Sequence, residues 1–241
     1  MSLSLIRSAL RGYGDPSKAL VLQRFFKTGP GEYAAGDLFI GINVPVLRSL
    51  AKKYQSLSLG EVLHLLKSRI HEERLLSLLI LILKYRAGDL VVKKKIYRAY
   101  LAHTAYINNW DLVDVTAKHI VGDFLKDRDR DVLYKLARSG SLWERRLAML
   151  TTFYFIEGRD FKDTLKIAEL LMADSHDLIH KAAGWMLREV GKRDLVVEER
   201  FLKKHCAIMP RTMLRYATER FPEAKRQAYL SVRKRGRMLS N

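Results

Sequence analysis

A tryptophan and a carboxylate share one face of an expected helix in the segment NWDLVD, residues 109–114. Trp110 and Asp114 are four residues apart, so on a helix their side chains lie next to each other. Asp111 falls in the first turn, where a carboxylate favours the helix dipole, whereas Asp114 lies too far in to cap the helix. The Asp114 carboxylate therefore either takes part in chemistry or forms an ion pair with Arg146 of the next repeat.

The three tryptophans of the chain are Trp110, Trp143 and Trp185. Trp185 follows Lys181 by four residues and precedes Arg188 by three, so a helix places it among cationic side chains. A tryptophan usually belongs to the core. If exposed in a basic groove, however, the faces of Trp110 and Trp185 form a cation–π site beside a surface that binds polyanions. Such a site fits a ligand that combines a cation with phosphates.

The elements that position these residues are predicted to be α-helices. The five prolines stand at positions 16, 30, 45, 210 and 222, so none interrupts the run from Val46 to Met209. Apolar residues recur at steps of three and four, as in Ile179, Ala182, Ala183, Met186 and Val190. No comparable alternating strand pattern occurs, and most glycines fall between the periodic segments. The sequence therefore predicts an all-α fold.

Several of the expected helices begin in a related way and at a regular interval. Their starts lie at His71, Asn109, Leu142, Asp177 and Met209, which are 38, 33, 35 and 32 residues apart. A second helix fits between each pair of starts, which is typical of helical hairpins of the HEAT or armadillo type. We therefore predict a HEAT-like or armadillo-type helical-repeat solenoid that forms a single domain over residues 1–241.

In such a solenoid the second helices of successive pairs line one concave wall. The N-terminal ends of these helices carry mostly cationic side chains: Arg74, Asp114, Arg145, Arg146, Lys181, Arg211 and Arg215. The whole chain has 44 Lys and Arg against 26 Asp and Glu, a net charge of +18, which makes a polyanion the first partner to expect. The sequence thus predicts a concave basic groove.

Cysteine content and hydropathy indicate the cellular setting. One cysteine, Cys206, excludes an intrachain disulfide and zinc sites that need several cysteines, and it fits a reducing compartment. Residues Met1 to Leu10 lack the pattern of a signal peptide, and the apolar stretch from Leu75 to Leu83 is broken by Ser77. We expect a cytoplasmic protein that does not enter a membrane.

Two stretches lie outside the repeat pattern. The segment from Lys27 to Gly41 contains four glycines and one proline, and we expect it to connect an N-terminal helical pair to the repeats. The end of the chain, residues 225–237, carries several cations and no acid: Lys225, Arg226, Arg233, Lys234, Arg235 and Arg237. This end either contacts a polyanion or is a solvated terminus without a specific contact.

Motifs for several kinds of chemistry do not occur. The chain has no P-loop, no GxGxxG fingerprint and no GxSxG elbow, so nucleotide hydrolysis, hydride transfer and serine hydrolase chemistry have no support. His176 and His180 have the i, i+4 spacing of a metal pair, but no third ligand stands at a suitable distance in the sequence. We therefore expect no metal and no nucleotide cofactor.

Taken together, NWDLVD, LWERR, HKAAGWMLREVGKRD and MPRTMLRYATERFPE resemble the DNA alkylation repair family, of the AlkC/AlkD type of HEAT-like DNA glycosylase. GINVPVLRSLAKKY, from Gly41, is similar to the segment that leads into the repeats of that family. The resemblance covers about residues 20–224. It implies a monofunctional DNA glycosylase of base excision repair that acts as a monomer on double-stranded DNA containing alkylated bases. The bond hydrolysed is the N-glycosidic bond of purines such as 3-methyladenine or 7-methylguanine, without a cofactor.

The resemblance also implies roles for individual residues. Trp110 and Asp114 look like the aromatic and the catalytic carboxylate of the family, and Trp185 looks like its second aromatic. Phe25 and Tyr33 are both candidates for a further aromatic from the N-terminal helices. The expected catalytic residues are thus Asp114, Trp110 and Trp185. The expected DNA-binding residues, with Arg146 as the groove arginine of the family, are Arg145, Arg146, Lys181, Arg188, Arg211 and Arg215.

These residue types suit the implied reaction. Alkylation at N3 or N7 makes the purine cationic, so bond breaking needs little activation of the leaving group and builds positive charge on the deoxyribose. A carboxylate stabilises that charge, as it does in glycoside hydrolysis. The alternative is a non-catalytic HEAT-repeat protein that binds damaged or branched DNA. A scaffold for an acidic protein also explains the charge, but it leaves Trp110, Asp114 and Trp185 without a role.

Overall fold

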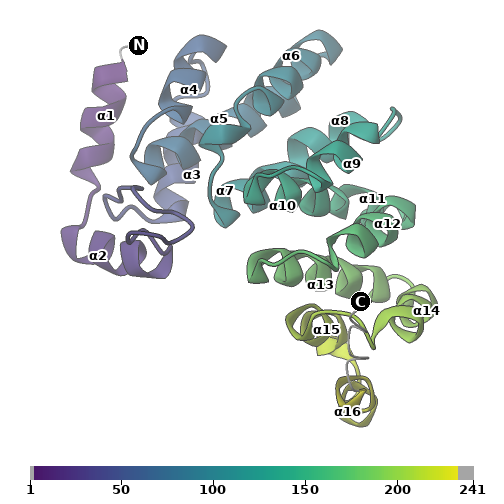
Figure 1. Ribbon diagram of the computed structural model, residues 1–241. Helices are drawn as coiled ribbons and strands as arrows, with labels where there is room; N and C mark the ends of the chain where they lie inside the picture. Colours follow the sequence, from purple (N-terminus) through teal and green to yellow (C-terminus); the bar gives the residue numbers. More distant parts are fainter. Residues whose placement is uncertain (1–2, 233–241) are drawn as a thin grey trace. The chain divides into compact units, whose positions relative to one another are not determined.

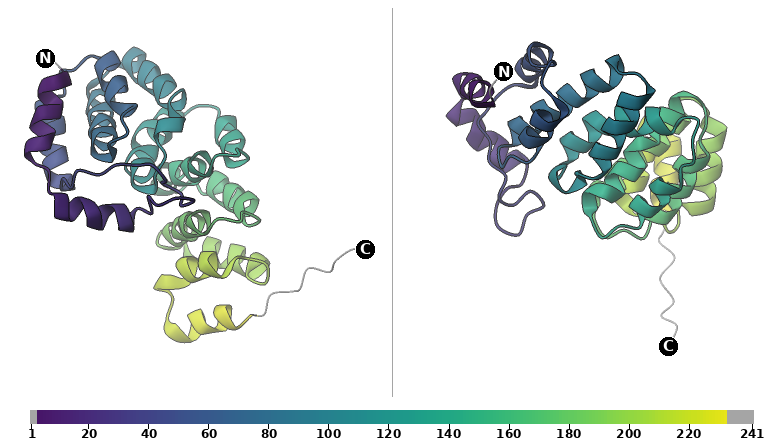
Figure 2. Two further views of the ribbon diagram at one scale, coloured as in Figure 1. Left: turned by 60° about the vertical axis from the view of Figure 1, so that its left-hand side comes forward. Right: turned by 90° about the horizontal axis from the view of Figure 1, so that it is seen from above.

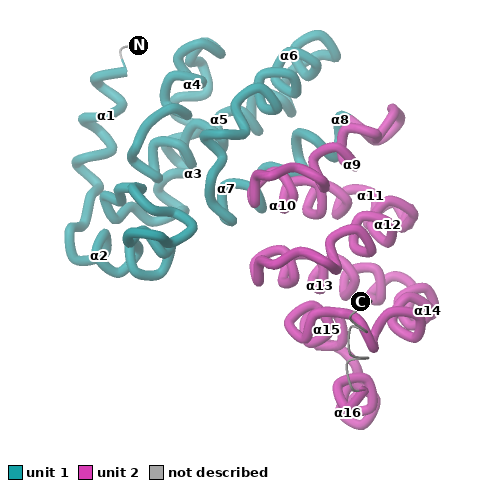
Figure 3. The backbone as a smooth tube through the Cα atoms, in the orientation of Figure 1, with its two compact units in different colours: residues 1–124 teal, residues 125–241 magenta. Residues whose placement is uncertain are grey.

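The structure is a computed structural model that describes residues 3–232. It divides into two compact units, residues 1–124 and 125–241, which are described one after the other (Figure 3). The described part of the chain is helical apart from turns, loops and one isolated bridge between Leu38 and Ile70. Residues Arg233 to Arg237 of the expected basic end lie outside the described residues.

Unit 1 holds the helices up to the start of α8 (Figure 1). Their bounds are Leu3–Gly12 (α1), Pro16–Phe25 (α2), Val44–Lys53 (α3), Leu59–Leu66 (α4), His71–Ala87 (α5), Leu90–Leu101 (α6) and Trp110–Ala117 (α7). A 3-10 turn, Thr104–Tyr106, precedes α7. After α7, a π-helical turn, Lys118–Gly122, leads directly into α8, Asp123–Leu125. A π turn contains an extra residue, so it changes which side chains point to one side of the helix.

Helix α5 is the centre of unit 1. It packs against α3, α4, α6 and α7, and its residues from His71 to Ile82 are buried on every side. The apolar run from Leu75 to Leu83 is thus the core of a folded unit, which explains its composition. None of the helices described between residues 3 and 232 combines the length and apolar character needed to cross a membrane.

The connection between α2 and α3, residues 26–43, is held to the first turn of α5. The buried carboxylate of Glu72 accepts hydrogen bonds from the backbone N–H groups of Ile40, Gly41 and Ile42, the shortest being 2.8 Å to Gly41. Gly41 has a φ of +85°, and a Cβ there would lie 2.1 Å from the Asp15 carbonyl oxygen. Only glycine fits this position, so the irregular segment takes a defined path across α5.

Unit 2 holds the remaining helices. Their bounds are Asp131–Ala137 (α9), Leu142–Thr151 (α10), Phe153–Glu157 (α11), Lys162–Leu171 (α12), Asp177–Gly191 (α13), Leu195–His205 (α14), Arg211–Ala217 (α15) and Glu223–Ser231 (α16), with a 3-10 turn at Thr218–Arg220. Helices α10, α13 and α15 lie side by side in one layer, and α9, α12 and α14 alternate with them in a second layer, as the labels of Figure 1 and the further views of Figure 2 show.

Short polar side chains fix where several helices begin. Asp15, Asp89 and Asp194 each accept a hydrogen bond from a backbone N–H in the first turn of α2, α6 and α14. Ser58 and Glu61 form a reciprocal capping box at the start of α4. Each such cap contributes about 1 kcal/mol, so the sequence sets the helix starts locally.

The all-α helical-repeat fold expected from the sequence is confirmed. Helices α5, α10 and α13 begin at the predicted residues His71, Leu142 and Asp177, while α7 and α15 begin one and two residues later than predicted. A further helix, α6, α9, α12 or α14, lies between each pair of these starts, as the hairpin pattern requires. The single domain over residues 1–241 stays a prediction.

Candidate functional site

The N-terminal end of α7 carries the tryptophan and the carboxylate. The side chain of the buried Asn109 accepts a hydrogen bond of 2.8 Å from the backbone N–H of Trp110 and so starts the helix. Trp110 and Asp114 are both half-buried. Since α7 is a regular helix up to Ala117, the two residues lie on one face, as their spacing predicts.

Trp110 belongs to an aromatic cluster built by residues of the N-terminal segment. The ring of Phe26 stacks on Trp110 with a centroid distance of 5.1 Å and on Phe39 with 5.0 Å. Phe25 meets Trp110 edge-on at 5.9 Å and is 61% exposed. Of the two N-terminal aromatics suggested by the sequence, Phe25 therefore presents an exposed ring next to Trp110.

A buried ionic network lies beneath this cluster. His71 Nε2 is 2.7 Å from a carboxylate oxygen of Asp111, and His71 Nδ1 is 3.5 Å from Asp37. Arg74 Nη2 donates to the same Asp37 carboxylate at 2.5 Å. The imidazole also stacks on Phe39 at 4.4 Å. The network thus ties the first turn of α7 to α5 and to the segment before α3.

The surroundings of His71 favour its protonated form. Burial lowers the pKa of His71, but the charge and hydrogen bond of Asp111, together with the hydrogen bond to Asp37, outweigh it, so the pKa is raised. Burial likewise raises the pKa of Asp37, yet the hydrogen bond from His71 and the charge of Arg74 leave it below its ordinary value. The carboxylates of Asp37 and Asp111 thus lie next to the two basic groups of His71 and Arg74, and all but Asp111 are almost fully buried.

The sequence-based placement of Arg74 in a basic groove is wrong. Its side chain is buried, pairs with Asp37 and donates a hydrogen bond of 2.9 Å to the Ser68 carbonyl. Arg74 therefore neutralises an internal carboxylate and does not offer charge to solvent.

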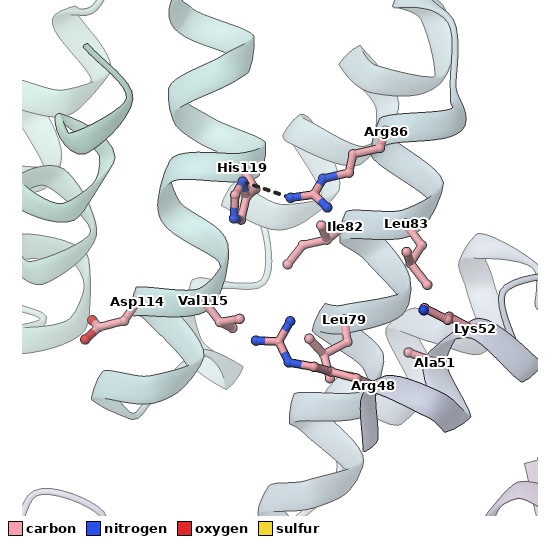
Figure 4. Close-up of a pocket in the computed structure, with 10 residues that line it drawn as sticks. All are labelled: Arg48, Ala51, Lys52, Leu79, Ile82, Leu83, Arg86, Asp114, Val115 and His119. Carbon is pink, nitrogen blue, oxygen red and sulfur yellow. Dashed lines mark hydrogen bonds between the residues drawn. The ribbon is translucent and has the colours of Figure 1, made fainter. Parts of the chain in front are cut away.

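Next to α7, unit 1 contains a pocket of about 450 Å³. Its basic residues are Arg48 and Lys52 from α3 and Arg86 from the end of α5, and His119 from the π turn lies beside them. Its apolar residues are Ala51, Leu79, Ile82, Leu83 and Val115. In the close-up, the carboxylate of Asp114 lies at the edge of the pocket and points away from these cations (Figure 4).

The expected DNA-binding residues of α10 make internal hydrogen bonds. Arg145 pairs with Asp174 at 2.6 Å and also donates to the carbonyls of Ser139 and Gly140. Arg146 is buried, with 5% exposed, and donates to the Leu178 carbonyl at 2.7 Å. These contacts link the start of α10 to the loop before α13 and to α13 itself.

The expected DNA-binding residues of α13 and α15 are more accessible. Lys181 forms an ion pair of 2.8 Å with Asp177 on the same helix, and Arg188 pairs with Glu219. Arg211 donates to the Leu230 carbonyl at 2.5 Å and is exposed, as is Arg215.

The two tryptophans of unit 2 differ in environment. Trp143 is a core residue with 8% exposed. Trp185 is half-buried, donates from Nε1 to Glu189 at 3.2 Å and meets Phe153 edge-on at 6.0 Å. The indole of Trp185 is thus partly exposed, whereas that of Trp143 belongs to the core.

Two features of the site were not predicted from the sequence. The first is the network around His71, which only the fold of the segment before α3 brings together. The second is the cationic pocket, for which a partial signal existed, because Arg48 and Lys52 are four residues apart and therefore share a helix face.

This fold and these residues define a class: an all-helical repeat protein with a large cation surplus and an aromatic and acidic pair next to a cationic pocket. The chain matches the family of DNA alkylation repair enzymes over residues 6–221, and it belongs to that family. The sequence-based assignment to DNA alkylation repair is confirmed at this level, and membership indicates an enzyme of DNA repair.

Solved structures show the same fold. A predicted DNA alkylation repair enzyme from Enterococcus faecalis superposes with a TM-score of 0.65 at 17% identity, covering 87% of this chain and 97% of that one. The protein smu.31 from Streptococcus mutans UA159 gives a TM-score of 0.51 at 17% identity, covering 78% and 91%. At such identities the likeness concerns the fold alone. None of the curated proteins matches this chain.

Proposed function

We propose that this protein is a monofunctional DNA N-glycosylase of the AlkC/AlkD type, which hydrolyses the N-glycosidic bond of cationic alkylated purines in double-stranded DNA. Its substrates are lesions of the 3-methyladenine and 7-methylguanine kind. It works as a monomer in the cytoplasm and needs neither a metal nor a nucleotide cofactor, because the cationic base is already an activated leaving group.

The observation that carries this proposal is the pairing of Trp110 and Asp114 on one accessible face of α7. As the glycosidic bond breaks, positive charge develops on the deoxyribose, and a nearby carboxylate lowers the energy of that state. Asp114 has this role and orients the attacking water. The family to which the chain belongs supports the DNA substrate.

Aromatic rings hold the cationic nucleotide. Trp110 is fixed by the stacked Phe26, and the exposed Phe25 adds a second ring beside it. For Trp185 on α13 of unit 2 we propose an aromatic contact with the DNA of the same kind. A ring face attracts a cation by about 0.5–2 kcal/mol, and this attraction distinguishes an alkylated purine from a neutral one.

Cationic side chains of unit 2 contribute to binding the phosphates of the DNA. Arg188, Arg211 and Arg215 offer donors at partly or fully exposed positions. Lys181 can exchange its ion pair with Asp177 for a phosphate, because an exposed pair of this kind is worth at most about 1 kcal/mol. Arg145 and Arg146 contribute mainly indirectly, because their internal hydrogen bonds fix the position of α10.

The decisive experiment incubates the purified protein with duplex DNA containing a single 7-methylguanine and measures the free base by mass spectrometry under single-turnover conditions. We expect release of 7-methylguanine well above the spontaneous rate and none from undamaged guanine. DNA binding without base release would instead identify a non-catalytic protein that binds damaged or branched DNA.

A further inference from the structure

The cationic pocket of unit 1 has the charge of an anion-binding site. Arg48 and Lys52 project from successive turns of α3, and Arg86 Nη2 lies 3.2 Å from His119 Nδ1 across the pocket. In residues 3–232, no carboxylate forms an ion pair with Arg48, Lys52 or Arg86. The only acid in its lining, Asp114, points away from the cations (Figure 4). Several positive side chains around a concave site strengthen the local electrostatic potential, and this potential attracts an anion.

A second polar pocket of the chain shows the contrast. It lies in unit 2 between the loop before α9 and the start of α12, and its lining alternates acids with bases. There Arg130 is paired with Asp160 and Asp163 at 2.6 and 2.7 Å, and Tyr134 donates to Asp163. That pocket neutralises its own charge, whereas the pocket at α3 does not.

The size and the apolar lining of the unit 1 pocket suit a ligand that is larger than a single anionic group. Its volume of about 450 Å³ exceeds the room that one phosphate group takes up, and it falls in the range of ligand sites. Leu79, Ile82 and Val115 form an aliphatic floor beneath the cationic rim. A sugar ring suits such a floor, and a phosphodiester suits the rim, so one sugar–phosphate unit matches both parts.

The π turn gives this pocket a second sign of function. The turn Lys118–Gly122 joins α7 to α8 and contains His119, whose ring it brings to Arg86. Single π turns inside α-helices are uncommon and frequently lie at functional sites, because their wider hydrogen bonding is less favourable than that of an α turn. Here the turn builds one wall of the pocket.

We infer that this pocket binds one sugar–phosphate unit of a DNA strand, next to the nucleotide at Asp114. Arg48 and Lys52 donate to the phosphodiester oxygens, and the deoxyribose packs on Leu79 and Val115. The inference rests on the proposed function, since it takes Asp114 to be the reacting carboxylate. This contact to the sugar–phosphate backbone of the DNA positions the strand relative to Asp114, and it does so without a contact to any base.

The test compares two double variants that each remove two positive charges. The pocket variant is Arg48→Ala with Lys52→Ala. The control is Lys53→Ala with Lys94→Ala, two exposed residues that do not line the pocket, of which Lys53 lies over the Tyr54 ring. Both are measured for affinity to a duplex with a tetrahydrofuran abasic analogue, which fixes the register and cannot be excised, and for melting temperature.

We expect the pocket variant to bind this duplex about tenfold or more weakly than the control variant, with unchanged melting. Replacing single phosphates near the analogue by neutral methylphosphonates should weaken wild-type binding by about tenfold at one linkage. The methylphosphonate at that linkage should not reduce the affinity of the pocket variant any further, whereas it should reduce the affinity of the control variant as much as that of the wild type. The charge-preserving variant Arg48→Lys with Lys52→Arg should recover most of the affinity.

Two results would overturn the inference. One is equal affinity of the pocket and control variants with no linkage-specific difference. The other is micromolar binding of free 2-deoxyribose 5-phosphate together with unchanged DNA binding by the pocket variant, which would assign the pocket to a small metabolite. Failure of the proposed function is a separate result: no 7-methylguanine release by the wild type, while the pocket variant still binds undamaged duplex more weakly than the control.

Discussion

At the scale of single residues, the proton on His71 decides whether Asp37 and Asp111 can both approach the same buried imidazole. With the proton, the ring donates from both nitrogens and separates two negative charges, while Arg74 pairs with Asp37 from the other side. Without it, one nitrogen becomes an acceptor that faces a carboxylate oxygen. Because Phe39 stacks on this ring and Phe26 contacts it at a tilt, the same proton helps to hold the aromatic cluster around Trp110.

We therefore expect the substitution His71→Gln to destabilise the protein more at acidic than at alkaline pH. A raised pKa in the folded state means that the stabilisation is fully present below the unfolded value near 6.5 and is lost as pH rises through the folded value. The variant should be about 1–3 kcal/mol less stable than the wild type at pH 6, and the difference should shrink at pH 9. Thermal melting of both proteins at the two pH values checks this.

Both proteins contain the same other titrating groups, so the effect of those groups on stability cancels in the difference between the wild type and His71→Gln. The same loss of stability at pH 6 and pH 9 would show that His71 acts through packing and not through its charge.

Asp114 permits a test of chemistry that leaves the shape of the side chain unchanged. In the variant Asp114→Asn, the negative charge that meets the developing positive sugar is lost. We expect excision of 7-methylguanine to slow by about 2–4 kcal/mol of barrier, on the order of a hundredfold or more, while DNA affinity stays the same or rises. Single-turnover base release and filter binding on one preparation measure both quantities.

The matched control is Asp127→Asn, which removes a carboxylate from an exposed loop position after α8. It should excise at the wild-type rate. If Asp114→Asn melts at a lower temperature yet excises normally per folded molecule, then Asp114 is a structural ion-pair partner and the catalytic assignment fails.

At the scale of elements, α13 and α14 meet around a buried acid. Glu198 on α14 is 2% exposed, and within the described residues its Oε1 has no hydrogen-bond partner. Gly191 at the end of α13 makes room for it, because a Cβ there would lie 1.6 Å from Glu198 Oε2. Burial, reinforced by the charge of Glu199, raises the pKa of Glu198 to about 8, although Arg188 opposes the shift.

The variant Glu198→Gln should therefore gain stability relative to the wild type as pH rises. The folded wild type must keep Glu198 protonated while the unfolded chain releases that proton above pH 4.5, so its stability falls from there up to about pH 8. The two proteins should be similar at pH 5, and the variant should be about 2–4 kcal/mol more stable at pH 8. Denaturant unfolding at both pH values measures the two free energies of unfolding. A Glu198→Gln variant that is less stable than the wild type at pH 8 would contradict this prediction.

The elements were far more predictable from the sequence than the site. Helix starts follow from local signals, such as the caps Asp89 and Asp194 and the apolar steps within each helix, and these act over a few residues. The burial of Arg74 depends on Asp37, which lies 37 residues earlier in a glycine-rich segment, so no local pattern reveals it. The sequence showed the face shared by Trp110 and Asp114, but it could not show that Phe26 stacks on that tryptophan.

At the scale of the whole molecule, ion pairing cannot remove the cation surplus. Each internal pair, such as Arg145 with Asp174, uses one positive and one negative charge, so the net charge of +18 remains on the other Lys and Arg residues however many pairs form. Isolated unpaired cations are almost never fully buried, so this surplus faces solvent. A surface of this kind repels itself and is stabilised by a polyanion.

The affinity for DNA should consequently fall steeply with salt, because each phosphate contact releases a condensed counterion. If about six phosphates are neutralised, affinity for undamaged duplex should drop by on the order of a thousandfold between 50 and 200 mM salt. Fluorescence anisotropy over a salt series measures the slope. Residues 233–241 carry four of the cations. If this end contacts DNA, removing it should reduce the slope of log affinity against log salt concentration by up to about four, and if the end is merely solvated the slope should not change. A nearly flat salt dependence of the full chain would contradict electrostatic binding and favour a partner that is not a polyanion.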